Sequence, residues 1–76
     1  MSEIAQTLDV RGQSCPLPVV RAAQAIKQLQ TGQILEVLAT DPGSLTDFPA
    51  WAKSTGNEIV EQHQDDGVFR YVVRKT

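Results

Sequence analysis

The only cysteine of this 76-residue chain stands directly before a proline, in the stretch Gly12-Gln13-Ser14-Cys15-Pro16-Leu17-Pro18. Proline is favoured in the first turn of a helix, because the amide hydrogens of that turn have no partner within the helix. A residue that precedes proline is driven away from helical backbone angles. We therefore expect a helix to begin near Pro16 to Pro18, with Cys15 held at its mouth in the cap position.

A thiol at the start of a helix ionises more readily than an ordinary thiol. The positive end of the helix dipole stabilises an anion by about 0.3 to 1 kcal/mol, and by up to ~2 kcal/mol in good geometry, which lowers a thiol pKa by roughly a quarter to one and a half units. Starting from about 8.5, the pKa expected for Cys15 lies near or somewhat above neutrality. Arg11, Asp9 and Asp41, expected at strand ends close to this helix, are candidates for tuning the thiol or for docking a partner.

A partly ionised, exposed and unpaired thiol suits attack on a sulfane sulfur or a disulfide, which leaves sulfur attached to the protein. This chemistry requires no metal, no cofactor and no acid–base pair, and we predict none. A single cysteine excludes an internal disulfide, a CxxC redox pair and a zinc knuckle. A thiol peroxidase or a disulfide reductase is a poorer prediction than a sulfur-accepting thiol, because the chain has no resolving cysteine.

The alternative hypothesis comes from a different class of function. A lone cysteine is often a small buried hydrophobic residue, so Cys15 would then be a structural helix cap in a non-catalytic interaction or regulatory module. The residues before it, Gly12, Gln13 and Ser14, are polar and typical of turns. They favour an exposed thiol, and therefore the reactive interpretation.

Length and composition restrict the function further. With 41% hydrophobic and 21% charged residues, the chain fits one domain over residues 1–76. So short a chain buries only about 60% of its surface, which favours an open sulfurtransferase relay over a multiple-turnover enzyme with a deep pocket. The net charge of −2 and the scattered basic residues argue against direct nucleic-acid binding. The chain shows no signal-peptide pattern and no apolar run of about eighteen residues, so we expect a cytoplasmic protein, away from membranes and monomeric when free.

The hydrophobic pattern predicts a strand, a helix and a second strand in the first half of the chain. Thr7 to Val10 alternates polar and apolar residues, as a short strand does. From Pro18 to Gln30, apolar residues recur at intervals of three and four, which indicates an amphipathic helix that Gly32 terminates. Ile34 to Thr40 is rich in apolar and β-branched residues and is typical of a central strand.

The second half predicts a helix followed by a hairpin. The helix ends at Gly56, and its start has two alternatives: Ser44 caps it with Asp47 three residues on, or Asp47 caps a helix that begins near Pro49. Strands are expected at Asn57 to His63 and Val68 to Arg74, with an Asp-Gly turn between them. Phe48 and Trp51 are expected in or beside the core, and His63 is expected to be an ordinary surface residue.

This order of elements, βαβαββ, predicts an α+β fold. The first βαβ unit should cross over right-handed and pair its strands in parallel, and the final hairpin is antiparallel. The expected fold is a two-layer α/β sandwich, in which a four-stranded mixed sheet carries both helices on one face. Its other face is left open and is a candidate surface for partner contact.

The residues also resemble the TusA/SirA-like sulfur carrier proteins from about Thr7 to Lys75. The resemblance lies in "LDVRGQSCPLPVVRA", "GQILEVLATDPGSLTDFPAWAKSTGNE" and "FRYVVRK". Cys15-Pro16-Leu17-Pro18 matches the CPxP signature of the family, and Asp47-Phe48-Pro49 matches its acidic-x-Pro element. The D-x-x-G element before the cysteine and the D-P turn after the second predicted strand stand at the spacings expected for the family.

The resemblance implies a βαβαββ sandwich whose cysteine carries sulfur. Cys15 would receive persulfide sulfur from a cysteine desulfurase or a rhodanese and pass it to an acceptor such as a DsrE-like or TusBCD-like protein. Members of the family serve tRNA thiolation, molybdenum-cofactor enzymes or sulfur oxidation. Leu17 stands where some members of the tRNA pathway have an acidic residue, which argues against transferring their partner contacts. Leu17, Arg21 and their neighbours would form the docking rim.

Overall fold

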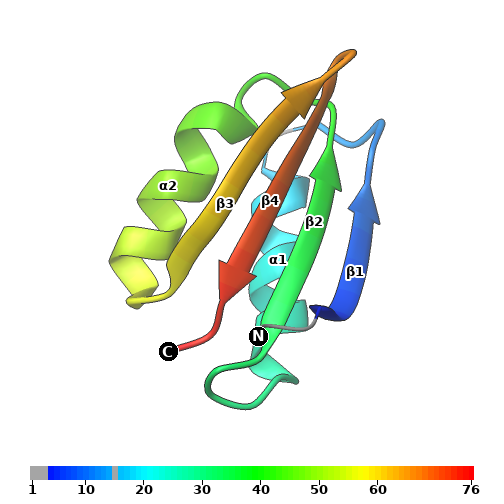
Figure 1. The fold of residues 1–76 in the computed structure, drawn as a ribbon. Helices are drawn as coiled ribbons and strands as arrows, with labels where there is room; N and C mark the ends of the chain where they lie inside the picture. Colours follow the sequence, from blue (N-terminus) through cyan, green and yellow to red (C-terminus); the bar gives the residue numbers. More distant parts are fainter. Residues whose placement is uncertain (1–3, 15) are drawn as a thin grey trace.

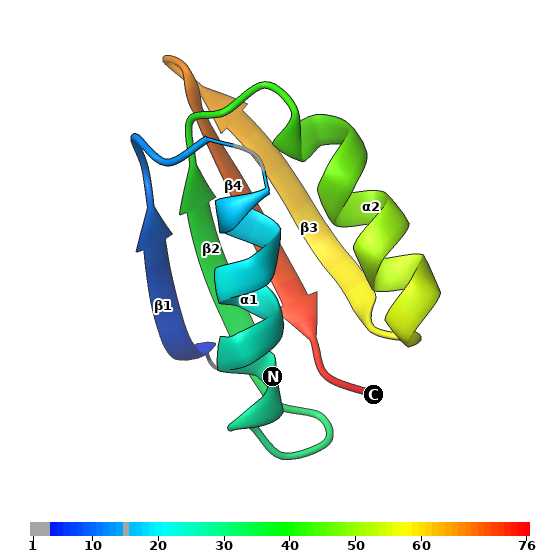
Figure 2. The same ribbon diagram turned by 180° about the vertical axis from the view of Figure 1, so that it is seen from behind.

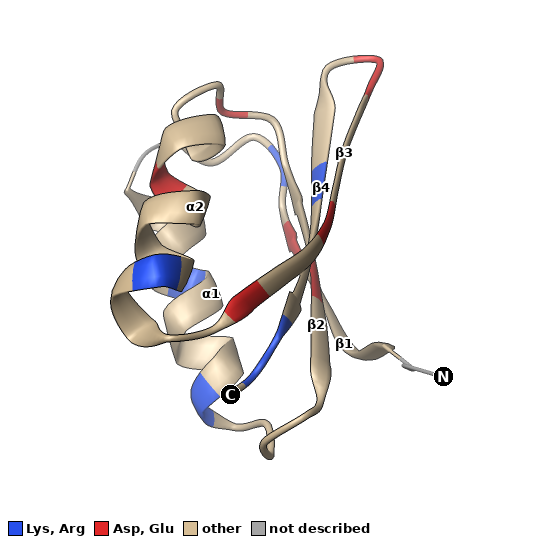
Figure 3. Cartoon of the chain, turned by 60° about the vertical axis from the view of Figure 1, so that its left-hand side comes forward, with Lys and Arg blue, Asp and Glu red and all other residues tan. Residues whose placement is uncertain are grey.

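The computed structural model describes residues 4–14 and 16–76, which form a four-stranded sheet covered by two helices (Figure 1). The elements are β1 (Ile4–Val10), α1 (Leu17–Lys27), β2 (Ile34–Ala39), α2 (Ser44–Thr55), β3 (Glu58–Asp65) and β4 (Val68–Arg74). The strand order is β1-β2-β4-β3, with β1 and β2 parallel and the other neighbours antiparallel. Both helices lie on one face of the sheet (Figure 3). The predicted α+β sandwich is confirmed.

The core lies between the helices and the sheet. Phe48 of α2 is fully buried and stacks on Tyr71 of β4 with ring centroids 4.4 Å apart, and Trp51 packs edge-on against Phe48 at 5.8 Å. Phe48 and Trp51 therefore take the core and core-rim positions that their spacing predicts. The remaining buried cluster comes from α1 and from alternate residues of the strands: Val10, Ala22, Ala25, Ile26, Leu35, Val37, Ala39, Phe69 and Val73.

The first half of the chain follows the prediction with shifted boundaries. β1 begins at Ile4 rather than Thr7. α1 ends at Lys27 rather than Gln30, because its last turn tightens: the Leu29 amide donates to the carbonyl of Ile26 at 3.1 Å. Lys75, at the far end of the chain, then donates to the carbonyl oxygen of Leu29 at 2.6 Å. A helix end set by so distant a residue leaves no local signal in the sequence.

Both alternatives predicted for the start of α2 are wrong. The helix begins at Ser44 with Gly43 as its N-cap, no side chain caps it, and Pro49 lies inside it. Ser44 does not cap because its hydroxyl is buried and lies 2.7 Å from the hydroxyl of Tyr71. The predicted end is confirmed, since Gly56 adopts a left-handed conformation with φ 79°.

The hairpin between β3 and β4 has the turn that the sequence predicts. Asp66 and Gly67 have φ angles of 50° and 80°, as a two-residue turn with a left-handed backbone requires. β3 runs from Glu58 to Asp65, so it starts and ends later than the predicted strand.

The Ser44–Tyr71 hydrogen bond makes a prediction about stability. Tyr71→Phe removes one partner and leaves the buried Ser44 hydroxyl unsatisfied, which should lower the free energy of unfolding by about 1 to 3 kcal/mol. The double variant Ser44→Ala/Tyr71→Phe removes both polar groups and should cost less than the sum of the two single variants. Urea unfolding of all four proteins measures this. Additive losses would show that the two hydroxyl groups do not interact.

Candidate functional site

The loop from β1 to α1 is fastened to the ends of two parallel strands (Figure 2). The backbone N–H of Gly12 donates to Oγ1 of Thr40, just beyond the end of β2, at 2.8 Å. The N–H of Gln13 donates to the carbonyl oxygen of Val10, the fully buried last residue of β1, at 3.2 Å. Gly12 has a φ of 82°, which a residue with a side chain rarely adopts. The loop is therefore held in a defined path toward α1.

The helix that follows starts without a capping side chain. Its N-cap residue is Pro16, so the expectation that Cys15 occupies the cap position is off by one residue. The N–H of Leu17 donates to the carbonyl of Ser14 at 3.0 Å, which joins the residues on either side of Cys15-Pro16. The first turn of α1 contains no acidic residue. The helix's own side chains thus leave the positive end of its dipole uncompensated. Cys15 itself lies outside the described residues.

The CPxP residues beyond the cysteine divide between core and solvent. Pro18 lies on the buried face of α1, together with Ala22, whereas Pro16 is exposed. Leu17 and Val20 are 48% and 42% exposed. Arg21 is exposed on the same helix. The start of α1 therefore presents an apolar rim with a cationic neighbour, and the docking of a partner on this rim stays a prediction.

Asp9 and Arg11 form an ion pair with each other at the end of β1. The guanidinium donates to both carboxylate oxygens, from Nε to Oδ1 at 2.9 Å and from Nη2 to Oδ2 at 2.8 Å. These bonds, with the Arg11 backbone N–H, lower the pKa of Asp9 from 3.8 to about 2, and the same pairing raises the pKa of Arg11. A pair with no net charge acts weakly on a neighbouring thiol, so Arg11 is a weaker tuning residue than the sequence suggests.

Asp41 stands on the same edge of the sheet, directly after Thr40. It is partly buried, and its carbonyl oxygen accepts the Ser44 N–H at 3.0 Å at the start of α2. Thr40 and Gln13 are the residues that sequence reasoning missed. Thr40 is the last residue of a strand predicted to lie parallel to the first, and this was its only signal. Oε1 of Gln13 is buried and has no hydrogen-bond partner within the described part of the chain.

His63 and other polar residues of the sheet lie on its open face and at its far end. Among residues 4–14 and 16–76, no three potential metal ligands gather, and no helix is long and apolar enough to cross a membrane. Thr7 and the guanidinium of Arg70 both donate to the carboxylate of Glu36, and these bonds lower the pKa of that carboxyl. Each of the other groups also has a partner: His63 pairs with Glu61, Arg74 with Glu58, and Lys75 with the carbonyl oxygens that follow α1.

Comparison with known proteins agrees with this architecture. The model of the family described as sulfurtransferase TusA matches residues 6–75. The chain belongs to this family. The sulfur carrier protein TusA of Allochromatium vinosum is 45% identical over 76 residues, covering 100% of both chains. A putative sulfur carrier protein of Halobacterium salinarum is 53% identical over 75 residues, covering 97% of this chain and 93% of that one. The crystal structure of a SirA-like protein from Desulfitobacterium hafniense superposes with a TM-score of 0.80 at 31% identity, covering 91% and 95% of the two chains.

The Asp9–Arg11 pair of this TusA-family protein predicts a pH dependence. A carboxyl whose pKa is lower in the folded than in the unfolded chain stabilises the fold above its unfolded value. The contribution is therefore present above pH 3.8 and is lost as the pH falls through about 2. Arg11→Gln should return the Asp9 pKa toward 3.8, measured by carboxyl-carbon NMR titration, and should lower stability above pH 3.8 but not below pH about 2. Arg21→Gln, the matched control, should leave the Asp9 pKa unchanged, and an equal shift in both variants would contradict the pairing.

Proposed function

We propose that this protein is a sulfur carrier that accepts sulfane sulfur on Cys15 as a persulfide and relays it to a partner protein. The observation that carries the proposal is the start of α1, which follows Cys15 with two prolines, no acidic side chain and no side-chain cap. An anion next to such a helix end is stabilised. The relatives named as sulfur carrier proteins support the same role.

The transfer step is a thiolate exchange. The Cys15 thiolate attacks the outer sulfur of a donor persulfide, R–S–SH, and a new S–S bond forms as the donor's S–S bond breaks. The donor leaves as the thiolate R–S⁻, and Cys15 becomes Cys–S–SH. Charge and protons balance, and no oxidant, reductant or metal takes part. Onward transfer is the same step with Cys15 as the donor.

We assign the choice of sulfur donor and acceptor to contacts between this protein and its partners. Leu17 and Val20 are exposed apolar residues of the first turns of α1, and Arg21 adds a cation beside them. Such a rim suits a partner that brings its own reactive sulfur to the loop, because transfer at an open site depends on docking. The proposed donors are a cysteine desulfurase or a rhodanese, and the proposed acceptors are DsrE-like or TusBCD-like proteins. The compartment proposed for this relay is the cytoplasm.

The second candidate, a non-catalytic interaction module, rests on the same exposed rim. Leu17 and Val20 would dock a partner equally well if no sulfur moved. The structural role that this candidate gives to Cys15 is weakened, because the N-cap of α1 is Pro16. The two candidates differ in what happens to the thiol.

Intact-protein mass spectrometry after incubation with a donor separates them. We expect a reductant-labile gain of one sulfur atom with a rhodanese and thiosulfate, or with a cysteine desulfurase and cysteine. Cys15→Ser should abolish the gain while docking persists. No gain with either donor, in a folded protein whose Cys15 can be alkylated, would contradict the carrier proposal.

A rim variant tests the docking part of the proposal separately. Leu17→Gln changes an exposed residue without adding charge to the first turn of α1 and should leave the fold intact. We expect slower sulfur transfer from the protein donor but an alkylation rate by a small reagent close to that of the unchanged protein. Ile4→Gln, at a similarly exposed apolar residue on β1, is the matched control and should transfer sulfur normally. Equal transfer rates for both variants would show that Leu17 does not contact the donor.

A further inference from the structure

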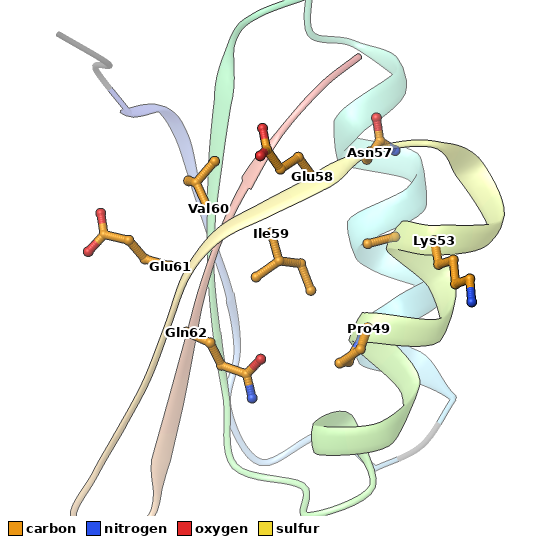
Figure 4. A pocket seen from close by; sticks show the side chains of 9 residues that line it. Pro49, Lys53, Asn57, Glu58, Ile59, Val60, Glu61 and Gln62 are labelled. Carbon is orange, nitrogen blue, oxygen red and sulfur yellow. The ribbon is translucent and has the colours of Figure 1, made fainter.

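A groove runs between α2 and the edge strand β3 (Figure 4). Pro49, Ala52 and Lys53 of α2 form one wall, and Asn57 with the first residues of β3, from Glu58 to Gln62, forms the other. Ala52 is buried at the base, while Pro49 is exposed. Residues of both walls are thus accessible to a ligand that lies along the strand.

β3 lies at one end of the strand order in the sheet, so only one of its two edges is paired. Its ladder is made with β4, and its other edge has no strand partner among the residues that the structure describes. An unpaired strand edge offers a row of backbone N–H and C=O groups to an extended polypeptide. A groove beside that edge gives room for the side chains of every second residue of the added strand.

The side chains along this strand point to its two sides, with an irregularity at Val60. Ile59 and Gln62 extend toward α2, whereas Glu61 points to the opposite side of the strand (Figure 4). Glu58 opposes Arg74 and forms an ion pair with it, one residue from the core-facing Ile59–Val73 pair. An added strand would therefore place one set of residues over Ile59 and the other set beside Glu61 and Glu58.

The acidic charge of β3 indicates which kind of polypeptide segment the groove can bind. Acidic residues mark the strand and its turn in Figure 3: Glu58, Glu61, Asp65 and Asp66. Pairing with β3 of a second copy would bring carboxylates together and is disfavoured. Lys53 on the α2 wall disfavours basic residues on that side of an added strand. The complementary segment thus has apolar residues facing α2 and Lys or Arg facing Glu58 and Glu61.

We propose that the groove between α2 and β3 binds an extended segment of a partner protein, in which apolar residues alternate with Lys or Arg, as an added β-strand. Val60, 40% exposed, lies where the register of the β3–β4 ladder shifts, and such an irregularity bends and twists the strand locally. That irregularity limits the added strand to a short segment and guards the edge against indiscriminate pairing.

The groove lies away from the β1–α1 loop. It is formed by the second half of α2 and the beginning of β3, whereas the loop leaves the opposite end of the sandwich, where β1 and β2 terminate (Figure 1). A partner that holds the carrier by this groove leaves the start of α1 accessible. The proposal does not depend on the chemistry of Cys15.

Titration with short synthetic peptides, followed by the amide chemical shifts of the protein, tests the proposal. The probe is a capped peptide of alternating Val and Lys, compared with the same pattern of Val and Glu and with the Val-Lys peptide N-methylated on alternate residues. We expect the Val-Lys peptide to shift amides of Asn57 to Gln62 and around Lys53. The Val-Glu and N-methylated peptides should bind weakly or not at all.

Two charge variants test the role of the acidic residues, and the second is the matched control for the first. Glu61→Lys alters an exposed groove residue and should weaken binding of the Val-Lys peptide by about two- to fivefold, the effect of losing one exposed ion pair. Asp65→Lys makes the same change in charge on the same strand but outside the groove, and should have a smaller effect. No shift at millimolar peptide, shifts confined to the open sheet face, or equal binding of all three peptides would overturn the proposal.

Discussion

The parallel pairing of β1 with β2 is the constraint on which the candidate site depends. Parallel strands finish at the same edge of a sheet, so the loop that leaves β1 passes beside the end of β2 before it enters α1. Thr40 then lies close enough to accept the Gly12 N–H. Val10 and Ala39, paired in the ladder and both fully buried, keep the two strand ends in place. The crossover thus holds Gly12 and Gln13, at the start of the loop, in a defined position at this edge of the sheet.

The proline motif follows the same constraint. Pro18 is buried against the sheet and anchors the first turn of α1, and Pro16 and Leu17 stay in solvent. Among the described residues no side chain caps the N-terminal amides of α1, so the helix directs its positive end toward the loop that precedes it. Under the proposed function, the backbone at this helix end would supply the electrostatics that activate the thiol, and the surface residues of α1 would supply the selectivity.

Most of the fold could be predicted from the sequence, because it is encoded in local patterns. The amphipathic period of α1, the apolar run of β2 and the Asp66-Gly67 turn each act over a few residues. The errors arose where a distant residue decides. Ser44 has the side chain of an N-cap but bonds to Tyr71 in the core, and Lys75, which follows β4, donates to a carbonyl just beyond the end of α1.

The candidate site shows the same division. The position of Cys15 before a helix was evident from Pro16 and Pro18, since proline restricts its neighbours in sequence. The contact of Gly12 with Thr40 was not, because it joins residues 28 positions apart. The pairing of Arg11 with Asp9 is local, and yet the sequence could not show whether Arg11 would turn to that carboxylate or to the thiol.

The pH dependence of Cys15 alkylation, measured in the folded protein and in the urea-unfolded chain, tests the central claim most directly. If the start of α1 activates the thiol, the folded midpoint should lie below the unfolded value of about 8.5, by roughly a quarter to one and a half units. High salt should reduce the difference. A folded midpoint equal to or above the unfolded one, or a thiol that the reagent reaches only after unfolding, would contradict the account.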